Sequence, residues 1–537
     1  MKKSILICGQ AGQGMNTTSV LIGRALVNAG YYSFIYRDYG SLIKGGHNFN
    51  IISFSDKPIH SHQNEFAAVI DLDGSSEQHR SSISKKTLVL KRNDAKYCLG
   101  KAGIKESSVQ VNNILLGLLF KNWGLPLNAL KKAAEKEMSS PGEVIKTIKL
   151  GHDCGLIQEP LKTLNLRKRY FLDGTKGVAQ GALASGLDVY LSYPMTPATG
   201  LLIELARKAK KHNLIVEQIE DEIGVINAAL GASYAGSMAM VGTSGGGFAL
   251  MSEALGLAGM AETPLVIYLA QRIGPATGVP THTAQGDLEF ARFAGAGEFP
   301  RILIAPGHPG EAITRTMEAF YLAYRYRLPA IILSDKHLSE SHYTLDEISY
   351  GKIQPDKNII SNPGKNYQSY ALTTDGVSPR AVPGQNAVVR ASSYEHDEWG
   401  LTTEDPVMIK KMNEKRWRKE KAAMRSIMRW QPAQVWGKGS RLLIGFGSTW
   451  GAIKDSLEDL PDYRFLQISY LAPFPKDIVL KEIDKSKDVI LIENNVTGLL
   501  GHLIAMETGR LIEKKILKYD GRPFTSDEIV KQVKKLS

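Results

Sequence analysis

The sequence predicts an α/β protein with three Rossmann-like, doubly wound domains. Short apolar runs typical of buried strands alternate with longer helix-permissive runs along most of the chain. This alternation stops and restarts, and each restart marks a new unit. The length of 537 residues fits three or four domains, taking roughly 150 residues per domain.

Four regions follow from this pattern. Residues 1–165 open with a strand, SILICG, a glycine-rich turn, GQAGQG, and a helix. In residues 170–340, the apolar runs VYLSYP, MAMVGT, PLVIYLA, RILIAP and PAIILSD predict a parallel sheet covered on both faces. Residues 341–435, rich in Pro and Gly, are predicted to be an ordered connector that ends in a basic helix. Residues 436–537 restart the alternation with SRLLIGFGST, YRFLQISY and KDVILIENN.

The net charge of +12 fits a nucleic acid, an acidic protein or a polyphosphate ligand. The basic residues are scattered except in Lys410–Arg429, which we predict to be a solvated helix, and no nucleic-acid motif accompanies them. No apolar run approaches the ~18–20 residues of a membrane span. The start, MKKSILICGQAGQG, has too short an apolar run for a signal peptide, so we expect a cytoplasmic protein with no membrane contact.

The three cysteines, Cys8, Cys98 and Cys154, are far apart in the sequence. Their spacing argues against a disulfide framework and against a complete four-cysteine cluster or zinc site within this chain. We predict that each is a small buried hydrophobe or an incidental thiol.

The glycine-rich turn places Gly9, Gly12 and Gly14 between a strand and a helix. Bare backbone N–H groups at a helix N-terminus favour anions, so this turn is a candidate phosphate site. The spacing is G-x-x-G-x-G and no Walker lysine is present, so a tight structural turn is an equal alternative. A second pair, Gly45 and Gly46, is predicted at the same sheet edge. His47 beside it reads as a surface or core histidine.

An acidic cluster leads into an apolar helix in VEQIEDEIGVINAALGASYAG, residues 216–236. On a 3.6-residue period, Glu222 shares a face with Val225 and Ile226, so its carboxyl is predicted to be buried. The other acids are predicted to be exposed charges at the helix start, where the macrodipole favours them. These are Glu217, Glu220 and Asp221. A buried carboxyl needs a partner, which singles out Glu222.

Three loops follow predicted strands and stand out as candidate sites. Two prolines stiffen the loop in SYPMTPATG, and GTSGGG joins a strand to a helix. Arg272 follows the strand LVIYLA, where a guanidinium can bind a carboxylate bidentately. Without a function, the first two loops would be rigid turns and Arg272 would be a surface arginine. His282, and the run YEHDEWG at 394–400, are poor metal candidates because consecutive residues rarely converge on one ion.

These motifs together resemble the 2-oxoacid:ferredoxin oxidoreductases. The resemblance rests on YPMTP, EDEIGVINAALGASYAG, GTSGGGFALMSEALG, QRIGPATGVPT and DGVSPRAVPG…EHDEWG. The chain looks like the alpha subunit of the two-subunit type, with a gamma domain, GQAGQG…YGSLIKGGHN, fused at its N-terminus. FGSTWGAIKDSL and IENNVTGLLGHL resemble the family's transketolase-like C-terminal domain.

The resemblance implies thiamine diphosphate bound between this chain and a beta subunit that holds the diphosphate, Mg²⁺ and a 4Fe–4S cluster. Glu222 matches the glutamate that hydrogen-bonds the aminopyrimidine ring nitrogen. Thr196 and Arg272 match residues that contact the substrate, and Thr281 is a weaker candidate for that pocket. Further cofactor contacts are implied at Tyr193, Pro194, Thr243 and Ser244. Coenzyme A is the implied co-substrate, with its phosphates near Gly9, Gly12 and Gly14.

The implied activity is oxidative decarboxylation of a 2-oxoacid to an acyl-CoA and CO₂, with electrons passed to ferredoxin. A heterodimer, or a dimer of heterodimers, is implied. Departures from the family pattern, such as Gly174–Gly177 and Ala198–Gly200, leave the substrate open. 2-Oxoglutarate is favoured over pyruvate and branched-chain oxoacids. A non-oxidative thiamine-dependent decarboxylase, or a basic protein that binds nucleotides or nucleic acid, are the alternative functions.

Overall fold

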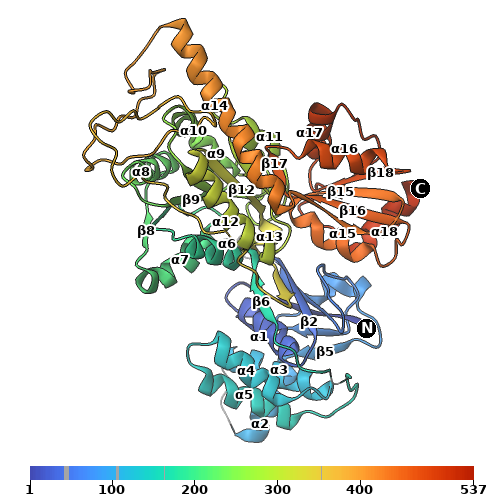
Figure 1. The fold of residues 1–537 in the computed structure, drawn as a ribbon. Helices are drawn as coiled ribbons and strands as arrows, with labels where there is room; N and C mark the ends of the chain where they lie inside the picture. Colours follow the sequence, from blue (N-terminus) through green and yellow to red (C-terminus); the bar gives the residue numbers. More distant parts are fainter. Residues whose placement is uncertain (41–46, 104–107, 163, 352, 537) are drawn as a thin grey trace. The chain divides into compact units, whose positions relative to one another are not determined.

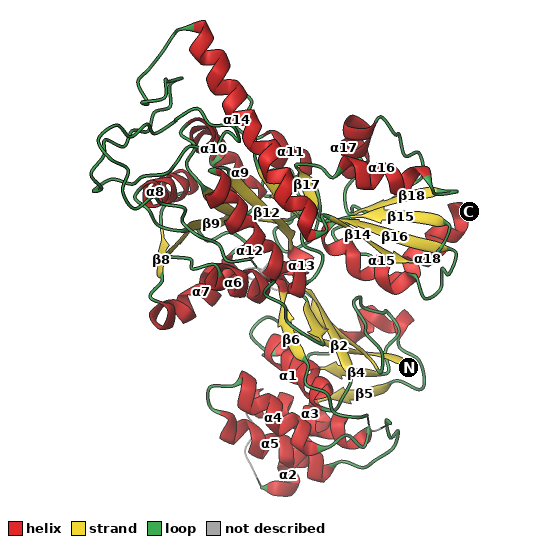
Figure 2. Cartoon of the chain, in the orientation of Figure 1, coloured by secondary structure: helices red, strands yellow, loops and turns green. Residues whose placement is uncertain are grey.

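The computed structural model describes residues 1–40, 47–103, 108–162, 164–351 and 353–536 (Figure 1). The described residues divide into two compact units. Unit 1 comprises Met1–Asp173, Glu340–Ile348 and Phe524–Lys531, and unit 2 comprises the rest. Together they hold three β-sheets within the described ranges, with helices packed on them (Figure 2). The predicted α/β class with three Rossmann-like domains is therefore confirmed.

Unit 1 is built on a mixed sheet with the strand order β5-β4-β1-β3-β2-β13-β6. Its strands are β1 (Lys2–Gly9), β2 (Tyr32–Asp38), β3 (Asn48–Ser55), β4 (Ala68–Asp71), β5 (Leu88–Lys91), β6 (Tyr170–Asp173) and β13 (His342–Leu345). Its helices are α1 (Met15–Asn28), η1 (Ser75–Ser82), α2 (Arg92–Ala102), α3 (Ser108–Asn122), α4 (Leu127–Glu137) and α5 (Pro141–Cys154). The strands β4 and β5 run parallel to β1, whereas β3 lies antiparallel between β1 and β2.

Two strands of this sheet were not predicted. β6 lies at the very start of the region 170–340, before its first predicted strand, and β13 lies in the Pro/Gly-rich region 341–435. β13 pairs with both β2 and β6, so that His342 lies opposite Ile35 and Asp173. Both strands are four residues long, which is too short for a two-residue period to stand out in the sequence.

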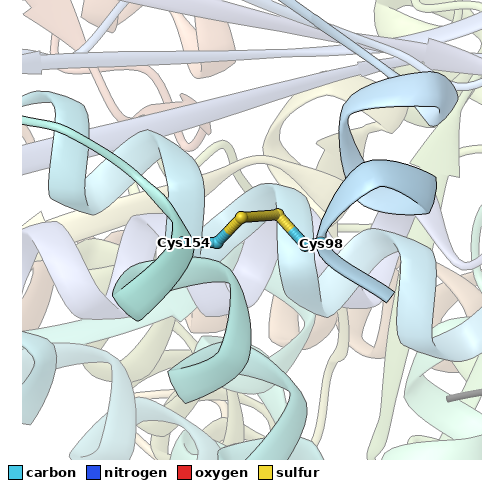
Figure 3. Close-up of a disulfide and its surroundings, with 2 residues drawn as sticks. All are labelled: Cys98 and Cys154. Carbon is cyan, nitrogen blue, oxygen red and sulfur yellow. A yellow bond between two sulfur atoms is a disulfide. The ribbon is translucent and has the colours of Figure 1, made fainter. Parts of the chain in front are cut away.

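The cysteine prediction was wrong for two of the three residues. Cys98 on α2 and Cys154 at the end of α5 form a disulfide, with their Cα atoms 6.0 Å apart (Figure 3). Cys8 is a buried free thiol, as predicted. The sequence could not show the pair because its members are 56 positions apart and only the packing of α2 and α5 brings them together. A cross-link over such a loop contributes about 2–4 kcal/mol to stability.

Unit 2 holds two sheets, and the larger of the two is mainly parallel, with the order β17-β11-β12-β10-β9-β7-β8. Its strands are β7 (Val189–Ser192), β8 (Ile215–Gln218), β9 (Ala239–Thr243), β10 (Leu265–Gln271), β11 (Ile302–Ile304), β12 (Pro329–Asp335) and β17 (Tyr470–Ala472). The helices are α6 (Gly174–Ala184), α7 (Thr199–His212), α8 (Glu222–Tyr234), α9 (Gly245–Leu250), α10 (Ser252–Met260), α11 (Leu288–Phe293), α12 (Pro309–Tyr326) and α13 (Lys336–Glu340).

The central strand of this sheet shows why the apolar runs predict burial on both faces. Along β10, Ile267 and Leu269 pack in one core with side chains of α8 and α10. Val266 and Tyr268 point to the opposite face and pack with side chains of α6, α7 and α12. Alternate side chains point to opposite faces of a strand, so a continuous apolar run is required when both faces are covered.

A second sheet of unit 2, with the order β14-β16-β15-β18-β19, forms the C-terminal domain. Its strands are β14 (Ala433–Gly437), β15 (Arg441–Gly445), β16 (Tyr463–Ile468), β18 (Val489–Glu493) and β19 (Lys515–Leu517). The helices here are η3 (Gly447–Thr449), α15 (Trp450–Ser456), α16 (Lys476–Asp484) and α17 (Leu499–Thr508). The last helix, α18 (Ser526–Leu536), is divided between the two units after Lys531. β17 leaves this domain and pairs antiparallel with β11 of the larger sheet.

The basic stretch forms α14 (Pro406–Ile427), followed by η2 (Met428–Trp430), but the prediction of a solvated helix was wrong for part of it. Lys410 and Lys411 are exposed. Lys415, Arg416 and Lys419 are at most 3% exposed, and each is paired with a glutamate. Lys415 and Lys419 pair with Glu262, and Arg416 pairs with Glu395. None of the helices in the described ranges is both long and apolar enough to cross a membrane.

Candidate active site

Four loops of unit 2 gather at one edge of the larger sheet. β7, β8, β9 and β10 are parallel neighbours, so the segments that follow them leave from the same, carboxyl, edge. Ligands bind at this edge in open α/β sheets. The segments hold YPMTP after β7, the start of α8 after β8, TSGGG after β9 and Arg272 after β10.

The start of α8 carries Glu222 into the interior. Asp221 is the N-cap and accepts hydrogen bonds from the backbone N–H groups of Ile223 and Gly224, at 2.8 and 3.1 Å. Glu222 is the first helical residue and is 3% exposed. It lies on the predicted face, beside buried Val225 and Ile226. Asp221 caps the helix as an exposed acid.

The other two acids of the cluster are also exposed, but one was misplaced by the prediction. Glu217 lies on strand β8 and not at the helix start. β8 is an edge strand in the order given above, and each of its residues is at least partly exposed. β8 is only four residues long and half exposed. Its hydrophobic pattern is therefore too short to distinguish it from the start of the helix that follows. Glu220 precedes the cap, as expected of a helix-start charge.

The Glu222 carboxyl faces the glycines that open α9. A methyl group added to Gly247 would lie 2.6 Å from Glu222 Oε1 and would overlap the Thr243 hydroxyl. Glu222 Oε1 is buried and has no hydrogen-bond partner among the residues the structure describes. A buried polar atom without a partner is costly, so it points to a group that this chain alone does not supply.

The flanking loops bring the remaining predicted cofactor residues to this edge. Thr243 ends β9 and is fully buried, with its Oγ1 4.0 Å from Met195 Sδ in the YPMTP loop. Ser244 is the N-cap of α9, and within the described chain its buried Oγ has no hydrogen-bond partner. Tyr193 and Pro194 directly follow β7 and are partly buried. Thr243, Ser244 and Glu222 therefore lie around the glycines that open α9.

Arg272 reaches across to the YPMTP loop. Its Nη1 donates to the backbone oxygen of Thr196 at 2.7 Å. Its Nε is buried and lacks a hydrogen-bond partner in the described ranges, and burial lowers the pKa of the guanidinium. The loop after Arg272 turns back, since Ile273 N donates to His282 O at 3.3 Å. Thr281 thereby returns to the start of the loop, where its Oγ1 lies 3.0 Å from His282 Nδ1.

Asp287 belongs to this site and was missed from the sequence. It precedes α11, and its carboxyl lies against Gly245, where an added methyl group would be 2.7 Å from Oδ2. Burial raises the pKa of Asp287 to about 6, and the positive charge of Arg272 acts in the opposite direction. The only hint in the sequence was an acid shortly after the Arg272 loop, in AQGDL.

The four charged or titratable residues of YEHDEWG hold the connector in place. Glu395 pairs with Arg416 and Glu398 accepts from Leu372 N. His396 Nδ1 lies 2.9 Å from Tyr394 O, and Asp397 accepts from two backbone N–H groups. In the described ranges, no group of three or more His, Cys, Asp or Glu side chains is placed to hold a metal ion.

The glycine-rich turn lies in unit 1, at the end of β1. Gly12 and Gly14 have φ values of 87° and 76°, which only glycine adopts readily, and Gly14 is the N-cap of α1. Gln13 Oε1 accepts from Gln10 N at 2.9 Å and braces the turn. Gly45 and Gly46 lie outside the described residues. His47 is partly buried, and its Nε2 lies 2.7 Å from His79 Nε2, a pairing the sequence did not indicate.

Comparison with known proteins decides the family. Residues 180–414 match the family described as pyruvate flavodoxin/ferredoxin oxidoreductase, thiamine diphosphate-binding, and residues 4–153 match pyruvate ferredoxin/flavodoxin oxidoreductase. A 2-oxoacid:ferredoxin oxidoreductase subunit alpha from Sulfolobus sp is 32% identical over 98% of this chain and 96% of its own length. The chain belongs to the 2-oxoacid:ferredoxin oxidoreductase family, as an alpha subunit. It is thus a member of an oxidoreductase enzyme family.

Two further relatives carry more specific names. The 2-oxoglutarate oxidoreductase subunit KorA of Mycobacterium tuberculosis is 30% identical over 80% of this chain and 68% of its own length. A solved structure, 2-oxoglutarate:ferredoxin oxidoreductase from Magnetococcus marinus with 2-oxoglutarate, coenzyme A and succinyl-CoA bound, superposes with a TM-score of 0.88. It is 28% identical, and the match covers 99% of each chain. The loops around Glu222 all fall within the thiamine diphosphate-binding match.

Proposed function

We propose that this chain is the catalytic alpha subunit of a thiamine diphosphate-dependent enzyme that oxidatively decarboxylates a 2-oxoacid. The products are an acyl-CoA and CO₂, and the electrons pass to ferredoxin. The favoured substrate is 2-oxoglutarate, supported by the names of the Magnetococcus marinus and Mycobacterium tuberculosis relatives. A separate beta subunit is required, and it holds the cofactor's diphosphate, Mg²⁺ and a 4Fe–4S cluster.

The observation that carries this proposal is the buried, unpartnered Oε1 of Glu222 beside Gly247. The absent side chain of Gly247 lets the backbone of α9 pack closely against the carboxyl. The unpartnered Oε1 of that carboxyl can share a proton with a ring nitrogen. The site therefore fits the aminopyrimidine of thiamine diphosphate. Glu222 would hold that proton at Oε1, while Tyr193, Pro194, Thr243 and Ser244 contact the cofactor. When bound, thiamine diphosphate supplies a nucleophilic carbon for the 2-oxo group and accepts the electrons released by decarboxylation.

Arg272 is the proposed partner of the substrate carboxylate. Its Nη1 is fixed on Thr196 O, which aims the guanidinium, and its buried Nε has no hydrogen-bond partner in the described ranges. A guanidinium presents parallel donors that match the two oxygens of a carboxylate. Thr196 and Thr281 lie beside it as further contacts, and their hydroxyls can donate to the substrate.

Unit 1 is proposed to contact coenzyme A. The glycine-rich turn offers backbone N–H groups at the start of α1, and Gly12 has open space where a side chain would be. Phosphates of coenzyme A would lie at Gly9, Gly12 and Gly14, since helix N-termini favour anions. The proposed assembly is a heterodimer with the beta subunit, or a dimer of heterodimers, in the cytoplasm.

The test is reconstitution of this chain with its beta subunit under anaerobic conditions. Reduction of a low-potential acceptor is followed with 2-oxoglutarate, pyruvate and a branched-chain oxoacid, with and without coenzyme A. We expect reduction that requires coenzyme A and is fastest with 2-oxoglutarate. A faster reaction with pyruvate or a branched-chain oxoacid would change the substrate only. Release of an aldehyde without an acceptor would show a non-oxidative decarboxylase instead. No reaction with any of the three oxoacids would refute the proposed function.

A further inference from the structure

A cavity of about 480 Å³ lies in unit 2, between the end of α12 and two stretches of the connector. The helix contributes Tyr324, Arg325 and the arginine that follows its end, Arg327. The connector contributes residues from the ranges 356–360 and 375–380. Sites for small molecules typically measure roughly 300–1,000 Å³, so this cavity is large enough for a metabolite.

The cavity and the candidate active site lie at opposite edges of the larger sheet. Arg327 is the C-cap of α12, and β12 begins at Pro329, two residues further on. β12 runs parallel to β10, whose far end leads into Arg272. Tyr324 Oη donates to Ser237 O at 2.9 Å, just before the start of β9. Because β10 is seven residues long, roughly 20 Å separates the two edges. A ligand in the cavity would therefore be distinct from the substrate.

Three arginines line the cavity, and within the described ranges none of them is paired with a carboxylate side chain. Arg380 is buried, and its Nη1 donates to Lys357 O at 2.9 Å while its Nη2 donates to Ser233 O. Arg327 is also buried and donates to backbone oxygens, among them Ser369 O at 2.9 Å. Backbone oxygens satisfy the N–H groups of a guanidinium but carry no full negative charge. The positive charges of these side chains are thus held in place without a counter-charge.

The buried charge behind the cavity is positive in sum. Glu262 acts on Arg327, but it already accepts hydrogen bonds from Lys415 and Lys419. Burial, together with the charges of Lys415 and Arg327, lowers the pKa of Lys419 to about 7. The sum stays positive when Lys419 loses its proton, because Arg380 adds a further cation. Such a surplus of positive charge attracts an anion to the cavity.

The groups that can contact a ligand directly lie on both sides of the cavity. Arg325 is partly exposed and forms no hydrogen bond or ion pair with any residue that the structure describes. Asp356 and Asp375 each hold a local turn with Oδ1, which accepts from Asn358 N at 3.3 Å and from Val377 N at 3.0 Å, respectively. A carboxylate has a second oxygen, which can accept from a ligand hydroxyl. The cavity therefore offers a cation and two acceptors for hydroxyl groups.

We propose that this cavity binds a phosphorylated metabolite that carries sugar hydroxyls and is no larger than a mononucleotide. Arg325 binds the phosphate, whose oxygens match the planar fork of a guanidinium, and the buried charge of Arg380 draws it inward. Asp356 and Asp375 accept from the hydroxyls, and Ile360 belongs to the apolar part of the lining. A dicarboxylate fits less well, because its second charge would lie beside these two acids.

The experiment titrates small probes calorimetrically into the complex of this chain with its beta subunit. The probes are AMP, ribose 5-phosphate, adenosine and succinate. We expect both phosphate esters to bind, and adenosine and succinate to bind at least about tenfold more weakly than AMP. Equal affinity for AMP and ribose 5-phosphate would assign the site to sugar phosphates, and tighter binding of AMP would assign it to nucleotides. No binding of either ester at millimolar concentration, or succinate binding as tightly as AMP, would overturn the proposal.

Arg325→Gln is the decisive variant. It should weaken AMP binding about tenfold or more. Its thermal unfolding should match the wild type, because Arg325 has no hydrogen bond or ion pair to lose in the described part of the chain. Arg207→Gln, at an exposed arginine on α7, is the matched control and should bind AMP as the wild type does. Wild-type affinity for AMP in Arg325→Gln contradicts the proposal.

A competition separates this cavity from the site proposed for coenzyme A, which also contains an adenosine phosphate. AMP is titrated again in the presence of saturating coenzyme A and 2-oxoglutarate. We expect the affinity for AMP to stay within about twofold of its value without them, because the cavity lies apart from the candidate active site. Displacement of AMP by coenzyme A would mean that AMP occupies the coenzyme A site, and the assignment of a separate metabolite site would be wrong.

Discussion

Two glutamates of unit 2 are both buried but differ in what surrounds them. Glu222 is 3% exposed and Glu262 is fully buried. Glu262 Oε1 accepts from Lys415 Nζ at 2.6 Å, and its Oε2 accepts from Lys419 Nζ at 3.0 Å. Arg327 donates to the backbone oxygen of Glu262 at 3.1 Å. Glu222 Oε1, by contrast, has no partner in the part of the chain that the structure describes.

The difference separates a structural carboxylate from a candidate catalytic one. Burial opposes the ionisation of Glu262, but Lys415, Lys419 and Arg327 outweigh it and hold the pKa of this carboxyl below its ordinary value. Its charge is thus balanced within the fold, and it fastens α14 to the larger sheet domain. Glu222 has a buried oxygen with no partner in the described chain, and a buried polar atom in this state is costly unless a ligand or a partner chain satisfies it.

The largest effect should come from Glu222→Gln. Glutamine keeps the size of the side chain but cannot hold and release a proton at Oε1, so turnover of the reconstituted enzyme should fall by about 10²–10⁴-fold. Stability should hardly change, because Glu222 Oε1 has no hydrogen-bond partner to lose among the residues that the structure describes. Acceptor reduction and thermal unfolding measure the two quantities. Glu217→Gln, on the exposed strand β8, is the control, and wild-type turnover in Glu222→Gln would break the comparison.

Glu262→Gln should show the reverse pattern. The substitution leaves Lys415 and Lys419 buried without a counter-charge, and breaking a buried ion pair in this way costs about 3–5 kcal/mol. Denaturant unfolding would record a lower midpoint, while the fraction that remains folded keeps its turnover. The exposed Glu253 on α10 supplies the control as Glu253→Gln. An unchanged midpoint in Glu262→Gln would mean that the cluster contributes no net stability.

The sequence predicted the Glu222 side of this comparison. The apolar positions that follow Glu222 fall on its own helical face, and the loops with Thr196, Ser244 and Arg272 each follow an apolar strand. Strand, loop and helix are local patterns, and parallel strands bring their carboxyl ends to one edge. These local patterns placed the loops at one edge of the sheet, whereas the roles of Thr196, Ser244 and Arg272 came from the resemblance to the family and remain predictions.

The buried ion pairs of Glu262 could not be predicted in the same way. Glu262 is a single acid in the short run AETP, and its partner Lys415 is 153 positions away. Lys415 and Lys419 looked like surface charges because a helix rich in Lys and Arg is usually solvated. The same limit applies to Cys98 and Cys154. Pairings of this kind depend on which elements pack together, and no local period records that choice.

Gly247→Ala tests the close packing beside Glu222 and should have a smaller effect. The added methyl group would overlap the Thr243 hydroxyl and lie 2.6 Å from Glu222 Oε1. Forcing a group into a filled site costs typically 1–3 kcal/mol, and here the loss should fall on cofactor binding. The concentration of thiamine diphosphate that gives half-maximal activity should rise. Gly246→Ala, at a neighbouring position with open space, is the matched control.

The smallest effects are slopes of stability with pH, and they have opposite signs. The folded pKa of Glu262 lies below its unfolded value of 4.5. Its contribution is therefore complete above pH 4.5 and is lost as the pH falls through the folded pKa. The folded pKa of Asp287 is raised from 3.8 to about 6. Its contribution is complete below pH 3.8 and is lost as the pH rises through about 6.

Denaturant midpoints between pH 3.5 and 7 should separate the two carboxyls. Glu262→Gln should flatten the loss of stability on the acid side, and Asp287→Asn should remove a decline between pH 4 and 6. Each slope is at most about 1.4 kcal/mol per pH unit for a single group. Asp287 should fall well short of this limit, because it is not fully buried. If both variants changed the midpoint in the same pH range, Glu262 and Asp287 would not differ in how the fold compensates their charge.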